Sequence, residues 1–160
     1  GGHTGQIAGF AFVQEVRRFW DGPIVLGGGI STGRAVRAAE VLGADYAYLG
    51  TRFIASEESM ADPEYKAMVV AASSGDIVCS DALTGVRANW LRQSLVRAGY
   101  DPDAMPSPGQ IDVIAAAGDA KRWRDVWSAG QGVGAIDAVQ PISAIVDDLA
   151  RDYETVKGAA

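Results

Sequence analysis

The chain is poor in the residues that build disulfides, metal sites and basic surfaces. Among its 160 residues there are one cysteine and one histidine, and 20 acidic residues against 14 basic ones give a net charge of −6. A single cysteine, Cys79, excludes an internal disulfide and leaves no cysteine cluster for a metal, so we expect no metal site. An acidic chain without a basic run argues against nucleic-acid and anionic-membrane partners.

Long hydrophobic runs are lacking as well. No stretch of about 18 uninterrupted apolar residues is present, and the chain does not open on a secretory signal pattern, so we expect no membrane span and a cytoplasmic protein. The length and a hydrophobic share of 48% suffice for one domain with a core. The first residue is not methionine, and the chain opens inside a glycine-rich loop. We therefore expect a fragment whose N-terminal portion is missing or was a separate chain.

Glycine is abundant, and it gathers in three clusters where expected strands lead into helices. The clusters are residues 1–5 (GGHTG), residues 27–29, and Gly50 with Thr51. Glycine at such a place lets backbone N–H groups approach an anion, and the following helix N-terminus adds a favourable dipole. Gly28 and Gly50 are 22 positions apart, which is one β/α unit. This spacing predicts two loops at the same end of neighbouring parallel strands, where they can bind one phosphate.

His3 carries the one imidazole near these clusters, and imidazole is a common acid–base group in enzymes. It lies between glycines rather than on an apolar face, so a buried core role is not favoured. Its imidazole could act as a base, an acid or a hydrogen-bond donor, and the alternative is a loop histidine that only orients the backbone. An imidazole beside a phosphate site indicates a cofactor enzyme.

Other polar residues near the expected strand ends have weaker signals. Asp45 and Asp76 flank strands, where solvated carboxylates are common. Arg52 could reach a phosphate, but an ion pair with the acidic residues at 57 and 58 is the favoured interpretation. Gln131, between two glycines, could hydrogen-bond a bound ring or belong to a plain turn.

Apolar periodicity predicts an alternation of helices and strands in the first half of the chain. Helices are expected over 7–20, 32–42, 62–72 and 142–156, and strands over 23–26 and 44–49. The rhythm is typical of a (β/α) barrel or an open doubly wound sheet, and so few units cannot close an eight-stranded barrel.

The rhythm is lost after residue 75. A strand over 76–80 and helices over 84–99 and 109–117 predict an inserted, mainly helical subdomain at 76–132. Residues 1–75 would then carry the phosphate site, and 133–160 would form a final helix that returns to the first part. We expect Trp90, Trp123 and Trp127 to pack in a core rather than stack on a cofactor.

Four strings together carry a family resemblance: GGHTG, PIVLGGGI, ADYAYLGTRF and WSAGQGVGAI. Together they resemble the nitronate monooxygenase family, formerly called 2-nitropropane dioxygenases, which are FMN-dependent TIM-barrel enzymes. The resemblance covers nearly the whole chain but only the C-terminal half of such a protein. It implies an α/β fold, namely the C-terminal part of a TIM (β/α)8 barrel with an inserted subdomain. FMN-dependent enoyl-acyl carrier protein reductases share the first three signatures, so the substrate is less well specified than the family.

The resemblance also implies roles for individual residues. His3 would be the catalytic base, and the backbone of Gly28 and Gly29 would hold the FMN phosphate, with the Thr51 hydroxyl completing the grip. The full set of implied cofactor-binding residues is Gly1, Gly2, Gly28, Gly29, Tyr48, Leu49, Gly50, Thr51 and Gln131.

The implied reaction oxidises alkyl nitronates or nitroalkanes with O2 to carbonyl compounds and nitrite. His3 would remove the α-proton of a nitroalkane or hydrogen-bond the nitro group. One alternative is an enoyl reductase that uses NAD(P)H, and another is a fragment that is inactive without the N-terminal half of the barrel. Because a half barrel exposes strand edges and an apolar interior, residues 1–160 alone are expected to aggregate or to bind FMN poorly. A homodimer is compatible with the resemblance.

Overall fold

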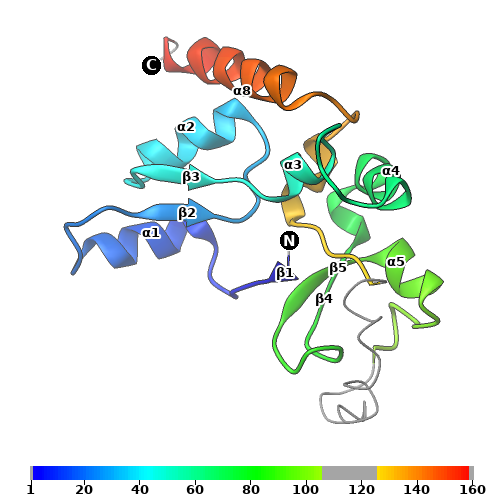
Figure 1. Ribbon diagram of the computed structural model, residues 1–160. Coiled ribbons are helices and arrows are strands. Elements are labelled where there is room, and N and C mark those ends of the chain that lie inside the picture. Colours follow the sequence, from blue (N-terminus) through cyan, green and yellow to red (C-terminus); the bar gives the residue numbers. More distant parts are fainter. Residues whose placement is uncertain (1, 106–125, 159–160) are drawn as a thin grey trace.

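The computed structural model describes residues 2–105 and 126–158, which form two parts that meet near β1 (Figure 1). The first part contains β2 (Val25–Gly27), β3 (Tyr46–Tyr48), α1 (Gly9–Arg17), α2 (Gly33–Val41) and α8 (Ile142–Lys157). The second contains β1 (Gly2–His3), β4 (Ile77–Ser80), β5 (Ala88–Leu91), α3 (Thr51–Ile54), α4 (Pro63–Ala71), α5 (Arg92–Arg97) and the 3₁₀ helices η1 (Ser74–Asp76) and η2 (Gln131–Ala135). The predicted α/β class is confirmed.

The first part follows the alternation that the sequence predicted. Strands β2 and β3 pair in parallel, with Gly27 opposite Tyr48, so both strands end at the same edge. The side chain of Thr32 caps α2 by accepting a hydrogen bond from the Ala35 N–H at 3.2 Å. After α2, Gly43 has a φ of +105°, a conformation that favours glycine and turns the chain toward β3.

Helix α2 lies directly against α8, and a glycine makes the contact possible. A Cβ atom on Gly33 would lie 2.0 Å from the Leu149 carbonyl oxygen and 2.4 Å from the Tyr153 nitrogen. No side chain can occupy that space, so the two helices approach with backbone against backbone. On the other side α2 buries Ala39 in a core with Val13 of α1.

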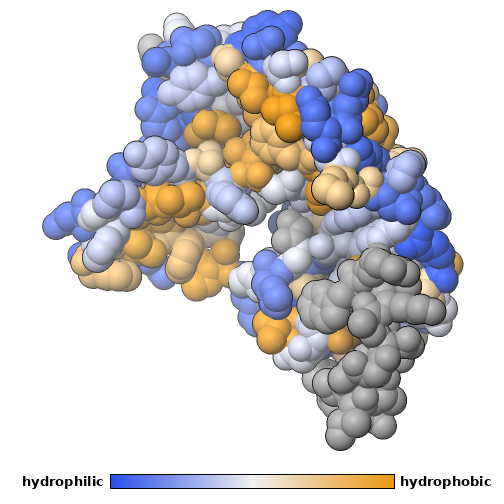
Figure 2. Space-filling model, in the orientation of Figure 1, coloured by the Kyte–Doolittle hydropathy of each residue, from blue (hydrophilic) through white to orange (hydrophobic). Residues whose placement is uncertain are grey.

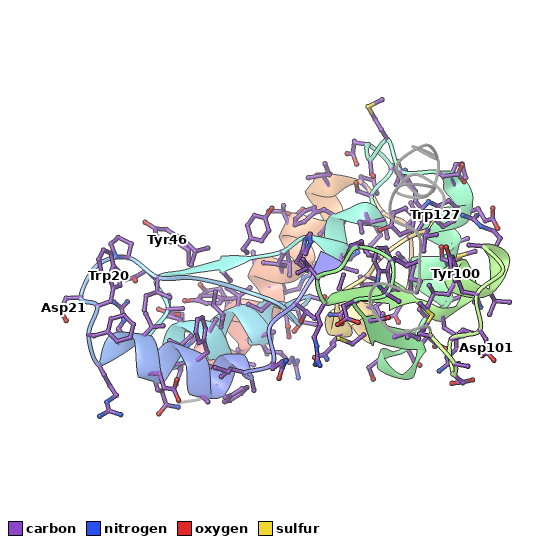
Figure 3. All side chains as sticks on the ribbon, turned by 90° about the horizontal axis from the view of Figure 1, so that it is seen from below. Trp20, Asp21, Tyr46, Tyr100, Asp101 and Trp127 are labelled. Carbon is purple, nitrogen blue, oxygen red and sulfur yellow. The ribbon has the colours of Figure 1, made fainter. Side chains whose placement is uncertain are left out.

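The opposite face of the parallel sheet is uncovered in the described structure. Val25, Tyr46 and Tyr48 are 59%, 64% and 69% exposed. The Tyr46 side chain points away from α1 and α2 in Figure 3. Phe10 and Phe19 of the α1 region are also exposed. Figure 2 shows hydrophobic surface on this part of the molecule, and within the described residues no element covers Val25, Tyr46 and Tyr48.

The second part differs from the sequence-based expectation. The helix predicted over 84–99 is wrong in its first half, because residues 88–91 form β5 and only Arg92–Arg97 are helical. Strand β5 lies in the middle of an antiparallel sheet of order β1-β5-β4. The described portion of 76–132 is therefore not mainly helical. The helix expected at 109–117 and Trp123 lie outside the described residues, and the division at residues 75 and 132 stays a prediction.

Two of the three described tryptophans, Trp90 and Trp127, pack in the second part, as predicted. Trp90 is 3% exposed. Trp127 stacks on Tyr65 with ring centroids 4.9 Å apart, and the Arg97 guanidinium lies 3.6 Å from the Trp127 ring centroid. Within residues 2–105 and 126–158, no helix is long and apolar enough to cross a membrane.

Candidate functional site

The three glycine clusters meet around one pocket of about 590 Å³ between the two parts of the molecule. Figure 2 shows the surface hollowed in this region. The lining residues are His3, Thr4, Gly5, Gln6, Ile7, Ala8, Gly9, Gly27, Gly28, Gly29, Tyr48, Gly50, Asn89, Gly130 and Gln131. The pocket thus joins loops that are far apart in the sequence.

The glycines at the ends of β2 and β3 leave this pocket open to a ligand. Gly28 and Gly29 have φ angles of +110° and +69°, which L side chains rarely adopt. A Cβ atom on Gly28, Gly29 or Gly50 would meet nothing within 4 Å. Side chains here would fill the space directly in front of the backbone amides. The geometry therefore fits a bulky anionic group such as a phosphate.

The N-terminus of α2 already has acceptors from within the chain. Besides the Thr32 cap, the Arg34 N–H donates to Asp152 Oδ2 at 2.8 Å, and the Arg34 side chain pairs with the same carboxylate. The Arg34 guanidinium, followed by its backbone N–H, lowers the pKa of Asp152. An anion in the pocket would therefore depend on the loop amides near Gly28, Gly29 and Gly50.

His3 reaches the pocket from the second part of the molecule. The sequence predicted a loop, but Gly2 and His3 form β1, paired antiparallel with Asn89 and Ala88 of β5. The Thr4 N–H continues this pairing by donating a hydrogen bond at 3.0 Å to the carbonyl oxygen of Arg87, the residue just before β5. The His3 side chain is exposed, which agrees with the prediction that it has no core role. Its backbone is held by the sheet while its imidazole stays accessible.

Thr51 ties a third loop into the site. The residue is 6% exposed, and its Oγ1 accepts a hydrogen bond from the Gly130 N–H at 2.8 Å. A Cβ on Gly132 would lie 2.5 Å from Ser31 Oγ and 2.8 Å from the Gly29 carbonyl oxygen. The segment 130–132 is therefore fixed against both glycine loops, and the exposed Gln131 lies at the pocket wall.

Two other residues predicted to bind the cofactor, Leu49 and Gly2, are not among those that line the pocket. Leu49 packs against the core formed around Val13 and does not line the pocket. Gly2 lies in β1 with a φ of +74°, beside the lining residue His3. Gly1 lies outside the described residues. No described group of three or more His, Cys, Asp or Glu side chains could hold a metal ion.

Arg52 does not form the ion pair that the sequence suggested, so that interpretation is wrong. Its Nη2 donates to Gln140 Oε1, and burial lowers the pKa of the guanidinium. The Glu58 carboxylate instead accepts the Ile142 N–H at 2.9 and 3.0 Å, at the start of α8. Arg52 therefore connects the segment after the Gly50 loop to the segment that leads into α8.

Neither of the two flanking aspartates lines the pocket. The Asp45 carboxylate accepts the Ile24 N–H at 2.8 Å and pairs with Arg17, before the start of β3. The Ile24 N–H, followed by Arg17, lowers the pKa of Asp45. Asp76 closes a capping box with Ser73, whose N–H lowers the pKa of its carboxyl. Both carboxylates therefore stabilise local structure and lie away from the candidate site.

Asn89 is a pocket residue that no motif in the sequence predicted. This residue lies in β5 opposite Gly2, is 6% exposed and lines the pocket. Its Oδ1 is buried and has no hydrogen-bond partner among the described residues. An asparagine between Ala88 and Trp90 belongs to no recognised motif, and only the long-range pairing of β5 with β1 brings it to the site.

The open backbone at Gly28, Gly29 and Gly50, called the cradle below, lies at the ends of parallel strands, where α/β proteins typically bind phosphate-bearing ligands. The family model described as nitronate monooxygenase matches residues 1–152. The chain therefore belongs to the nitronate monooxygenase family, and the resemblance read from its motifs is confirmed.

Individual relatives are similar over nearly the whole of this chain. The chain is 33% identical to the protein Rv1533 of Mycobacterium tuberculosis over 96% of this chain and 45% of that protein. Among solved structures, FabK from Thermotoga maritima matches with a TM-score of 0.81 and 33% identity, over 99% of this chain and 53% of FabK. A nitroalkane oxidase from Streptomyces ansochromogenes matches with a TM-score of 0.76 and 27% identity, over 99% and 50%. The chain spans about half the length of these proteins.

Proposed function

We propose that the protein containing this chain is an FMN-dependent nitronate monooxygenase that oxidises alkyl nitronates with O2 to carbonyl compounds and nitrite. The observation that carries the proposal is the pocket that joins His3 to the open backbone at Gly28, Gly29 and Gly50. Membership of the nitronate monooxygenase family supports the reaction class.

The residues present fit FMN. The amides around Gly28, Gly29 and Gly50 would hold the phosphate, because no side chain stands in front of them. Tyr48 and Gln131 line the same space and would border the rest of the cofactor. Flavin bound there would supply the electron transfer between the nitronate and O2. Thr51 would act in this site by holding the Gly130 amide, and a direct contact of its hydroxyl with the phosphate stays a prediction.

His3 is the proposed proton-handling residue. Its accessible imidazole can accept the α-proton of a nitroalkane or donate a hydrogen bond to a nitronate oxygen. The pairing of β1 with β5 fixes the backbone on which this imidazole is carried. A base of this kind is useful only if its position is fixed, because proton transfer requires hydrogen-bond contact.

We further propose that additional β/α units cover the exposed face of β2 and β3 and complete a TIM barrel. The apolar face around Val25, Tyr46 and Tyr48 supports this, since such a surface is unfavourable in water. The roughly twofold greater length of the relatives supports it as well. A cytoplasmic location and a homodimer stay predictions.

The decisive experiment is rapid-mixing spectroscopy on the full-length, FMN-loaded protein without oxygen. We expect fast loss of oxidised-flavin absorbance with propionate-3-nitronate and little change with NADH. Reduction by NADH, with no response to nitronate, would contradict the monooxygenase and support the enoyl reductase named from the shared motifs. A crotonyl thioester would then serve as its electron acceptor.

Replacing the histidine tests its role separately. In His3→Ala we expect FMN to be retained while turnover falls roughly 10²–10⁴-fold, the usual loss on removing a general base. The bound-flavin spectrum and the steady-state rate measure the two quantities. Unchanged turnover at normal FMN content would show that His3 only orients the loop.

A further inference from the structure

Asn89 is a polar residue in an otherwise apolar strand. Ala88 and Trp90, its neighbours in β5, pack with Leu95 in a hydrophobic core, and Leu91 packs in another. Asn89 is paired with Gly2 on one side and Cys79 on the other, so its backbone lies in the middle of the sheet. The residue is only 6% exposed and still borders the pocket.

The Asn89 side chain leaves a hydrogen-bonding atom unused. Oδ1 is buried and has no partner within the described part of the chain. Buried polar atoms without partners are rare and costly, so each one calls for an explanation. The pocket that Asn89 borders is also lined by Gly28, Gly29 and Gly130, whose lack of side chains leaves room for a ligand. None of the described donors reaches Oδ1, and a ligand in the pocket would bring one.

We propose that Asn89 binds the flavin directly, its Oδ1 accepting a hydrogen bond from a hydroxyl or ring N–H of the cofactor. The inference rests on the proposed FMN site. Oδ1 is an acceptor and needs a donor. A nitronate anion and O2 carry no N–H or O–H group, whereas FMN carries ribityl hydroxyls and a ring N–H. The chemistry of the unpaired atom therefore selects the cofactor over the substrate.

The test compares FMN binding by the full-length apoprotein and its variants, with flavin fluorescence as the signal. Asn89→Leu keeps the number and branching of the side-chain heavy atoms and removes the polar ones. Because leucine is larger than asparagine, Asn89→Ala is a second variant in case leucine packs poorly. Gln93→Ala, at an exposed amide of α5, is the control. We expect the Kd for FMN to rise about three- to tenfold in both Asn89 variants, as for the loss of one hydrogen bond, and to stay unchanged in the control.

Melting temperatures separate a ligand contact from a structural role. Because the unpaired oxygen is unfavourable without ligand, Asn89→Leu should leave the Tm of the apoprotein unchanged or higher. The rise in Tm on adding FMN should be smaller than in the wild type. A structural asparagine would instead lower the Tm of the apoprotein.

Several results would overturn the inference. Wild-type affinity for FMN in both variants refutes it, and so does an equal loss of Tm with and without FMN. An unchanged Kd for FMN with a raised KM for nitronate would place the contact on the substrate instead. If the wild-type protein itself does not bind FMN, the proposed cofactor fails and the inference fails with it.

Discussion

Replacing Gly33 with alanine should destabilise the protein, although alanine is the better helix former. The added Cβ would lie 2.0 Å from the Leu149 carbonyl oxygen and 2.4 Å from the Tyr153 nitrogen. Both are backbone atoms, so no rotamer change can relieve the overlap, and α8 must move away from α2. Overpacking of this kind costs about 1–3 kcal/mol. The gain in helix propensity is at most about 1 kcal/mol, so the overlap dominates.

Gly9→Ala provides a matched control. Gly9 and Gly33 each begin a nine-residue helix. A Cβ on Gly9 would meet only the tip of the Leu26 side chain, at 3.3 Å, which can rotate away. Urea unfolding of the full-length protein should therefore show a loss of about 1–3 kcal/mol for Gly33→Ala and little change or a small gain for Gly9→Ala. Equal stability of the two variants would refute the reasoning from backbone overlap.

Further predictions concern Thr51 and the Arg17–Asp45 pair. Thr51→Val leaves the buried Gly130 N–H without its acceptor. We expect urea unfolding to show a free energy of unfolding lower by about 1–3 kcal/mol, together with weaker FMN binding, whereas Thr51→Ser should keep the stability and the FMN affinity of the wild type. Arg17 donates to three backbone carbonyls and to Asp45. Arg17→Ala should therefore lower the free energy of unfolding by about 1–3 kcal/mol without changing the Kd for FMN. A changed Kd would contradict the inference that this end of the strands is independent of the pocket at the other end. The lowered pKa of Asp45 means that its charged form stabilises the fold at neutral pH, and this contribution is lost as pH falls from about 4 toward the folded-state pKa. Asp45→Asn should therefore show a smaller fall in Tm between pH 6 and pH 3 than the wild type, and an identical fall would refute the assignment.

Local patterns in the sequence were sufficient for the first part of the fold. The Thr32 cap, the Gly43 stop and the glycines after β2 are short-range signals, and each specifies structure within a few residues. They also placed Gly28 and Gly50 at one edge, because parallel strands one unit apart end together. The position of the candidate cradle therefore follows from the amino-acid sequence alone.

Long-range pairing explains what could not be predicted. Every residue of β5 is buried, so its sequence shows no alternation between polar and apolar faces, and a helix was as good a guess. The contact of Gly132 with the Gly29 loop joins positions about 100 residues apart. Asn89 became a site residue only through its register with Gly2, which no local motif encodes.

The segment that carries Gln131 joins the pocket to the interior of the second part. At its start, the Trp127 N–H donates to the Ser94 hydroxyl at 2.7 Å, and the Trp127 carbonyl accepts from β5 at 3.0 Å. A few residues later, Gly130 is bonded to Thr51 at the cradle. A ligand bound at the cradle would therefore contact a segment whose position depends on the packing of Trp127. By thermodynamic reciprocity, any factor by which ligand binding favours the packed state of Trp127 is also the factor by which that packed state raises the affinity for the ligand.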